Sequence, residues 1–144
     1  TLDGLRSRLV DIGTDLLVRG LAEGLTPPRP QEGEPVYADK IEPDEHRLHL
    51  DHPAVVLDRV IRLGRAWCQF RDRRLKVLTA EAIPAGDEAA AAVDGLPPGA
   101  LTGPIAATGD GALQLVTVQP EGKAPMPAAA WLNGVQPTPS DRLA

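Results

Sequence analysis

The chain has 144 residues, of which 42% are apolar and only 3% aromatic, which is enough for one small domain plus a segment of another. The net charge of −5 argues against a protein that coats nucleic acid indiscriminately. The single Cys68 excludes an internal disulfide framework, and no signal peptide or membrane-spanning apolar run is present. We therefore expect a cytoplasmic location and no membrane partner.

The first element is a predicted amphipathic helix that occupies most of residues 1–26. Leu5, Leu9, Ile12 and Leu16 follow the spacing that lays one apolar stripe along a helix. Gly24 and the following Pro-Pro pair end the pattern. Because this helix begins at Thr1, with no preceding segment to pack against, we interpret residues 1–26 as the detached terminal helix of another domain.

Residues 27–50 are rich in Pro, Glu, Gly and Asp and lack a sustained apolar period, which predicts an interdomain linker. The next domain is expected to span residues 51–144. Asp51 is placed to cap a second helix with Pro53 in its first turn. The buried side of that helix is expected to consist of Val56, Leu57, Val60, Ile61 and Gly64.

Short strands are predicted after this helix, at residues 67–70, 74–80, 99–107 and 112–119. Thr108–Gly111 has the Asp-Gly chemistry of a hairpin turn, and residues 84–98 read as a loop. A final helix is expected at residues 126–132, with Asn133-Gly134 at its end. The fold class is therefore α+β: a small, partly open β-barrel of the oligonucleotide-binding kind, preceded by an isolated helix and an irregular linker.

A basic stretch stands out against the acidic background. Residues 59–76 carry seven basic side chains and one acid, a local charge of +6, which leaves −11 for the rest of the chain. The stretch could contact RNA phosphates, or it could be a solvated surface paired with acids. Strand alternation should place Arg74 and Lys76 on one face and Arg73 and Leu75 opposite. Our candidate nucleic-acid-binding residues are Lys40, Arg59, Arg62, Arg65, Arg71, Arg74, Lys76 and Lys123.

No metal site and no catalytic residue is predicted in this chain. His46, His49 and His52 recur every three residues, but no cysteine or carboxylate cluster completes a tetrahedral site, so a solvated turn is the better interpretation. Cys68 lacks a paired base and is expected to be a small buried apolar side chain.

The C-terminal third contains a recognisable signature. It consists of the run Thr108–Leu113 (TGDGAL), then Leu115, Val118-Gln119-Pro120, Gly122-Lys123 and Met126. This series resembles the closing signature of methionyl-tRNA formyltransferases. Upstream, Pro30-Gln31 and Tyr37–Ile41 (YADKI) resemble the interdomain linker of that family, and Arg59–Arg62 (RVIR) resembles the helix that opens its C-terminal domain. The chain departs from the family pattern at His49-Leu50 and at Gly64–Trp67.

The resemblance implies a role in the transfer of a formyl group from 10-formyltetrahydrofolate to methionyl-initiator tRNA, in translation initiation. The catalytic Asn, His and Asp of the family lie outside these residues, so this piece is expected to bind the tRNA and no cofactor of its own. Its partners would be initiator methionyl-tRNA and the N-terminal formyltransferase domain of the same protein, but not DNA. The alternatives are the C-terminal domain of another folate-dependent formyltransferase or formyl-folate hydrolase, or a stand-alone oligonucleotide-binding module without catalysis.

Overall fold

The computed structural model describes residues 1–144 and contains two compact units, residues 1–41 and residues 42–144. The first unit contains α1 (Leu2–Glu23), which is followed by a segment without helix or strand. The Thr1 hydroxyl caps α1 by accepting a hydrogen bond from the Gly4 N–H, and the helix stops at Gly24, whose φ is 89°. The predicted helix and its end are confirmed. No helix in the chain is long and apolar enough to cross a membrane.

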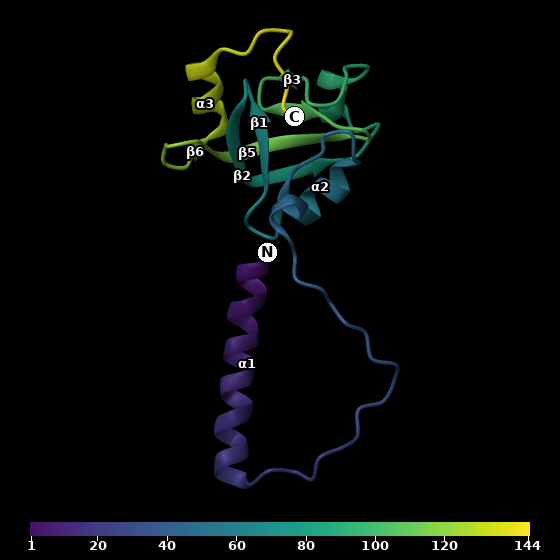
Figure 1. Ribbon diagram of the computed structural model, residues 1–144, viewed down its shortest axis with the longest axis vertical. Coiled ribbons are helices and arrows are strands. Elements are labelled where there is room, and N and C mark those ends of the chain that lie inside the picture. Colours follow the sequence, from purple (N-terminus) through teal and green to yellow (C-terminus); the bar gives the residue numbers. More distant parts are fainter. The chain divides into compact units, whose positions relative to one another are not determined.

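The second unit is a six-stranded antiparallel sheet with three short helical segments and α3 around it (Figure 1). The strands run in the order β1-β2-β5-β4-β3, and β6 adds to β5. Their bounds are β1 (Trp67–Phe70), β2 (Arg73–Ile83), β3 (Leu101–Thr102), β4 (Ile105–Ala107), β5 (Ala112–Pro120) and β6 (Met126–Pro127). The helical segments are η1 (Pro43–His46), α2 (Ala54–Ile61), η2 (Glu88–Val93) and α3 (Ala128–Val135).

The C-terminal segment links the two ends of this sheet and makes it a partly open barrel. Leu143 bridges to Phe70 at the edge of β1, and Arg142 bridges to Ala100 just before β3. Figure 1 shows this segment, in yellow, returning from α3 to the region between β1 and β3. Residues 142–144 therefore replace a closing strand, and the expected partly open barrel is confirmed.

The barrel core is made of aliphatic side chains, as the low aromatic content requires. α2 contributes Ala54, Leu57 and Ile61, which pack with Cys68 and Val77 of the sheet. Phe70 and Trp131 form an edge-to-face pair with ring centroids 5.0 Å apart. This pair joins α3 to the end of β1.

The compact unit begins earlier than the expected boundary at residue 51. Leu48 and Leu50 are buried in the core, and Arg47 forms a parallel bridge with Trp67. The Leu48 N–H also donates to the Trp67 carbonyl at 2.8 Å. Residues 42–50 were predicted as part of the linker because of their polar composition. Instead, they contribute two buried leucines to the core and pair with β1 at Trp67.

Several expected element bounds were wrong. The predicted strand 99–107 is a short hairpin of β3 and β4, and the predicted loop 84–98 contains η2. The predicted helix 126–132 begins later, because Met126 and Pro127 pair with β5, and it continues through Asn133-Gly134.

The expected cap of α2 was also wrong, because Pro53 is its N-cap and no side chain caps it. The backbone of Asp51 instead packs against Gly109, where an added Cβ would lie 1.7 Å from the Asp51 carbonyl oxygen. The hairpin turn at Thr108–Gly111 is confirmed: the Thr108 N–H donates to the Gly111 carbonyl, and Gly111 has φ 77°.

Candidate nucleic-acid interface

The β1–β2 hairpin sorts the basic stretch into two faces. Trp67 pairs with Lys76 and Gln69 pairs with Arg74, so these four side chains share one face of the sheet. Leu75 is buried on the other face, whereas Arg74 and Lys76 are exposed. The predicted alternation of Arg74 and Lys76 against Leu75 is therefore confirmed. Arg73 pairs with Phe70 at the end of the hairpin, on the same face as Leu75, and it is exposed there.

Two guanidinium groups lie over the indole ring of Trp67. The Arg74 Cζ atom lies 4.2 Å from the ring centroid, and the Arg47 Cζ atom lies 5.5 Å from it. At these distances the electron-rich ring face attracts each cation and restricts its rotamers. We call Arg47, Trp67, Gln69, Arg74 and Lys76 the Trp67 surface. It presents three positive charges with no carboxylate partner.

Arg47 and Trp67 were not among the binding residues predicted from the sequence. Their contact depends on the bridge between two segments that lie 20 residues apart. No local motif marks an arginine in a polar segment as the neighbour of a later strand. An aromatic residue at the start of a basic strand was the only available signal.

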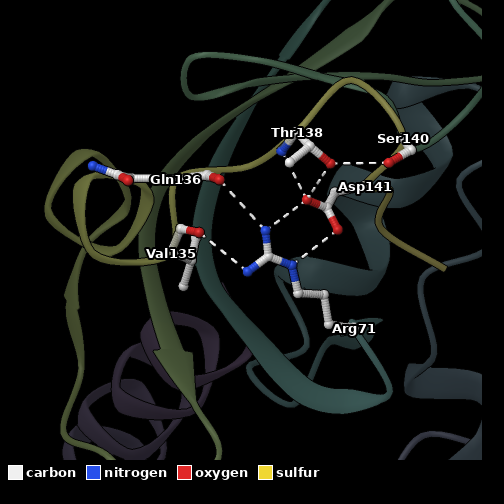
Figure 2. A network of polar contacts seen from close by, with 6 residues as sticks. All are labelled: Arg71, Val135, Gln136, Thr138, Ser140 and Asp141. Atoms are coloured by element: carbon white, nitrogen blue, oxygen red, sulfur yellow. Dashed lines mark hydrogen bonds and ion pairs between the residues drawn. The ribbon is translucent and has the colours of Figure 1, made fainter.

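Arg71 has a different role, because its guanidinium group is held by the C-terminal segment (Figure 2). Its Nε and Nη2 atoms donate to the two carboxylate oxygens of Asp141, at 2.9 and 2.6 Å. Nη1 donates to the Val135 carbonyl at 3.1 Å and Nη2 to the Gln136 carbonyl at 3.4 Å. Arg71 thereby satisfies carbonyl groups at the C-terminal end of α3, which have no partner within the helix.

The partner carboxylate is fixed as well. Asp141 also accepts from the Thr138 N–H at 2.7 Å and from the Thr138 hydroxyl at 2.9 Å. The hydrogen bond from Arg71, followed by those from Thr138, holds the pKa of Asp141 well below its usual value, and the same pair raises the pKa of Arg71. The donors of Arg71 are thus used inside the fold, and we leave this residue out of the proposed interface.

The turn that carries Arg71 has an uncommon backbone. Arg71 and Asp72 have φ values of 49° and 60°, and the flanking residues Phe70 and Arg73 are paired. Two consecutive left-handed residues match the type I′ hairpin turn, whose twist suits the adjoining strands but usually calls for Asn-Gly. The contacts of Arg71 hold the turn in this form and so position Arg73 and Arg74 beyond it.

The remaining candidate cations lie on other elements. Arg62 pairs with Asp58 at 2.9 Å in a partly exposed contact, so its charge is offset. Arg59, on the exposed side of α2, and Arg65, just after this helix, have no ion pair. Lys123 is exposed in the β5–β6 turn, and Lys40 lies in the irregular segment of the first unit. Their contacts with nucleic acid stay predictions.

A cleft of about 410 Å³ opens beside the hairpin, between the β1–β2 turn, the β5–β6 turn and α3. Leu75, Met126 and Trp131 line its apolar part. Arg73, next to the β1–β2 turn, and Lys123, in the β5–β6 turn, also line the cleft, as does Glu121. The cleft therefore combines an apolar interior with two cations that have no carboxylate within ion-pair distance.

The other chemical groups of the chain do not assemble a reactive centre. Cys68 is buried, as predicted, and desolvation raises the pKa of its thiol to about 12, partly opposed by the charge of Arg47. His49 and His52 are exposed, with ring centroids 5.7 Å apart, and His46 is half-buried. No three His, Cys, Asp or Glu side chains come together in a way that could hold a metal ion.

Comparison with known proteins agrees with the resemblance seen in the sequence. Residues 40–136 match the family described as formyl transferase, C-terminal domain. The methionyl-tRNA formyltransferase of Thermobifida fusca (strain YX) is 38% identical over 148 residues, covering 94% of this chain and 46% of that protein.

Two further methionyl-tRNA formyltransferases show the same extent of similarity. That of Corynebacterium glutamicum (strain R) is 40% identical over 147 residues, with 94% of this chain and 45% of that protein covered. That of Parafrankia sp. (strain EAN1pec) is 34% identical over 157 residues, with 100% and 49% covered. The chain thus spans about half the length of these relatives. The chain belongs to the formyl transferase C-terminal domain family, and it corresponds to the C-terminal portion of methionyl-tRNA formyltransferases.

Proposed function

We propose that this chain is the tRNA-binding portion of a methionyl-tRNA formyltransferase and that the Trp67 surface contacts the phosphate backbone of the tRNA. The observation that carries the proposal is a set of cations without ion-pair partners: the exposed Arg74 and Lys76 on one face of β2, with the half-buried Arg47 beside them over Trp67. Guanidinium groups donate two parallel hydrogen bonds to phosphate oxygens, and charges of this kind supply most of the sequence-independent affinity for nucleic acid.

The packing of the two arginines on Trp67 favours such binding. A free arginine side chain loses rotamer freedom when it pairs with a phosphate, but the ring contacts of Arg47 and Arg74 already restrict that freedom. The overall charge of −5 does not oppose local binding, because salt screens charges separated by more than about 8 Å under physiological conditions. Arg59, Arg65 and Lys123 would extend the contact from neighbouring elements.

In this proposal the chemistry of formyl transfer resides in the remainder of the protein. An N-terminal formyltransferase domain would bind 10-formyltetrahydrofolate and transfer its formyl group to the amino group of the methionyl-tRNA. The present chain would hold the tRNA in the cytoplasm during that reaction and supply no catalytic residue. The apolar stripe of α1, which is exposed along its whole length, would pack against that domain.

The test is a titration of initiator methionyl-tRNA at several salt concentrations. The double variant Arg74→Glu/Lys76→Glu removes two cations of the Trp67 surface, and the control Arg8→Glu/Arg19→Glu makes the same change in net charge on α1. Each lost phosphate contact should reduce the slope of log affinity against log salt by about 0.7 to 0.9. We therefore expect a slope reduced by about 1.6 in the first variant and an unchanged slope in the control.

An unchanged salt slope in Arg74→Glu/Lys76→Glu, with circular dichroism like that of the wild type, would refute the assignment of this surface. An equal loss in both variants would show that net charge alone governs binding, and it would count against the proposal as well.

A further inference from the structure

We infer that the cleft between the β1–β2 turn, the β5–β6 turn and α3 receives one unpaired nucleotide of the bound RNA. The inference rests on the proposed RNA binding and adds a second, chemically distinct subsite to it. The Trp67 surface and the cleft adjoin at the end of the same hairpin, because Arg74, which packs on Trp67, also lines the cleft. A nucleic-acid chain that crosses the end of this hairpin would meet both.

The interior of the cleft suits a nucleobase. Leu75, Met126 and Trp131 present apolar and aromatic atoms, and the volume of about 410 Å³ falls within the range of small-molecule sites. A base still paired and stacked in a helix cannot enter a cleft of this kind. An unpaired base can, and it gains the burial of its apolar faces in exchange for little lost stacking.

The charges at the cleft suit the phosphate that accompanies such a base. Arg73 and Lys123 approach from opposite turns and neither forms an ion pair. Arg71 also lines the cleft, but Asp141 neutralises it. Glu121 is the one acid at the lining, and a carboxylate there can accept a hydrogen bond from an exocyclic amine of a base. An anionic ligand with an apolar, flat part is thus favoured over a purely apolar peptide.

The helix α3 offers a way to fill the cleft without disturbing the fold. Gly134 lines it, and a Cβ added there meets no atom within 4 Å. Leucine is also a better helix former than glycine, by up to about 1 kcal/mol. Gly134→Leu should therefore occupy the cleft while leaving the helix intact. Ala129→Leu adds leucine to the same helix at an exposed position outside the cleft, and it serves as the matched control.

The experiment compares a blunt RNA duplex with the same duplex carrying a short single-stranded 3′ extension, by fluorescence anisotropy with the 144-residue chain. We expect the wild type and Ala129→Leu to bind the extended duplex about tenfold more tightly than the blunt one. Gly134→Leu should lose this preference and retain its affinity for the blunt duplex. In addition, 4-thiouridine in the extension should crosslink on irradiation to the peptide that contains Met126 and Trp131.

The outcomes separate this inference from the proposed function. Salt-dependent binding of both duplexes with equal affinity, or a crosslink to Trp67 itself instead, would overturn the nucleotide site and leave the tRNA-binding proposal intact. A preference that persists in Gly134→Leu would also overturn it, and would leave the cleft to another occupant such as a peptide segment. Failure to bind either duplex would refute the proposed function and the inference together.

Discussion

Replacement of Gly99 by alanine tests whether the C-terminal segment holds the barrel together. Gly99 has φ 82°, and an added Cβ would lie 2.0 Å from the carbonyl oxygen of Leu143. Because a carbon and an oxygen that are not bonded cannot approach that closely, residues 142–144 would have to move away from the sheet. The movement would break the hydrogen bond from the Leu143 N–H to the Gly99 carbonyl. It would also break the two backbone hydrogen bonds between Gln69 and Ala144.

The loss of stability follows from these contacts. Three backbone hydrogen bonds contribute about 1 kcal/mol each, and the left-handed backbone costs an alanine about a further 1 kcal/mol. Gly86 is a matched control, since its φ is 83° and an added Cβ there meets nothing within 4 Å. We therefore expect Gly99→Ala to lower the free energy of unfolding by about 4 kcal/mol and Gly86→Ala by about 1 kcal/mol.

Equilibrium unfolding in urea, followed by the fluorescence of Trp67 and Trp131, measures both values. The difference between the two variants isolates the contact with Leu143, because the backbone cost is common to both. Equal destabilisation of Gly99→Ala and Gly86→Ala would refute the idea that the C-terminal segment closes the barrel. The slope of the transition should stay unchanged if the denatured state is unaffected.

Further predictions follow from two ionisable groups, Asp141 and Cys68. Arg71 lowers the pKa of Asp141, so the pair stabilises the fold above the ordinary carboxyl pKa and loses this effect as the pH falls below it. Asp141→Asn should therefore lower the melting temperature at neutral pH, and this difference from the wild type should disappear in acid. Asp94→Asn, at an exposed position without an ion pair, is the control and should show no such change. A difference in melting temperature between Asp141→Asn and the wild type that is the same at every pH would contradict the prediction. Burial raises the pKa of Cys68 to about 12, so the native thiol should resist iodoacetamide at about pH 8 and react only in urea. Stability should also fall as the pH rises above the ordinary thiol value of 9.0, since only the unfolded thiol then ionises, and rapid alkylation of the native protein would contradict the assigned burial.

The local pattern of the sequence was sufficient for the elements whose signals are periodic or chemical. The leucine stripe and Gly24 placed α1, and the Thr108–Gly111 turn placed the hairpin between β4 and β5. Alternation within residues 73–76 correctly separated Arg74 and Lys76 from Leu75. These features depend on neighbours a few residues apart, so the sequence contains the necessary information.

The roles of the basic residues depended on contacts between distant segments. Nothing in the order of residues distinguishes Arg71 from Arg74, yet the first is paired with an aspartate 70 positions later and the second lies over Trp67. The Arg71-Asp72 turn adopts a backbone that its residue types do not favour, because α3 and the C-terminal segment hold it there. The same applies to barrel closure by residues 142–144 and to the late start of α3, where pairing with β5 outweighs the helical signal of Met126-Pro127.

By itself, then, the sequence determined α1, α2 and the strands β1, β2 and β5, and it showed that positive charge is concentrated between residues 59 and 76. Only the tertiary structure decided which of those charges are free to meet a ligand. The physical reason is that a charged side chain is neutralised or exposed by whatever the fold brings within a few ångströms of it, and those neighbours come from chain segments far away in sequence.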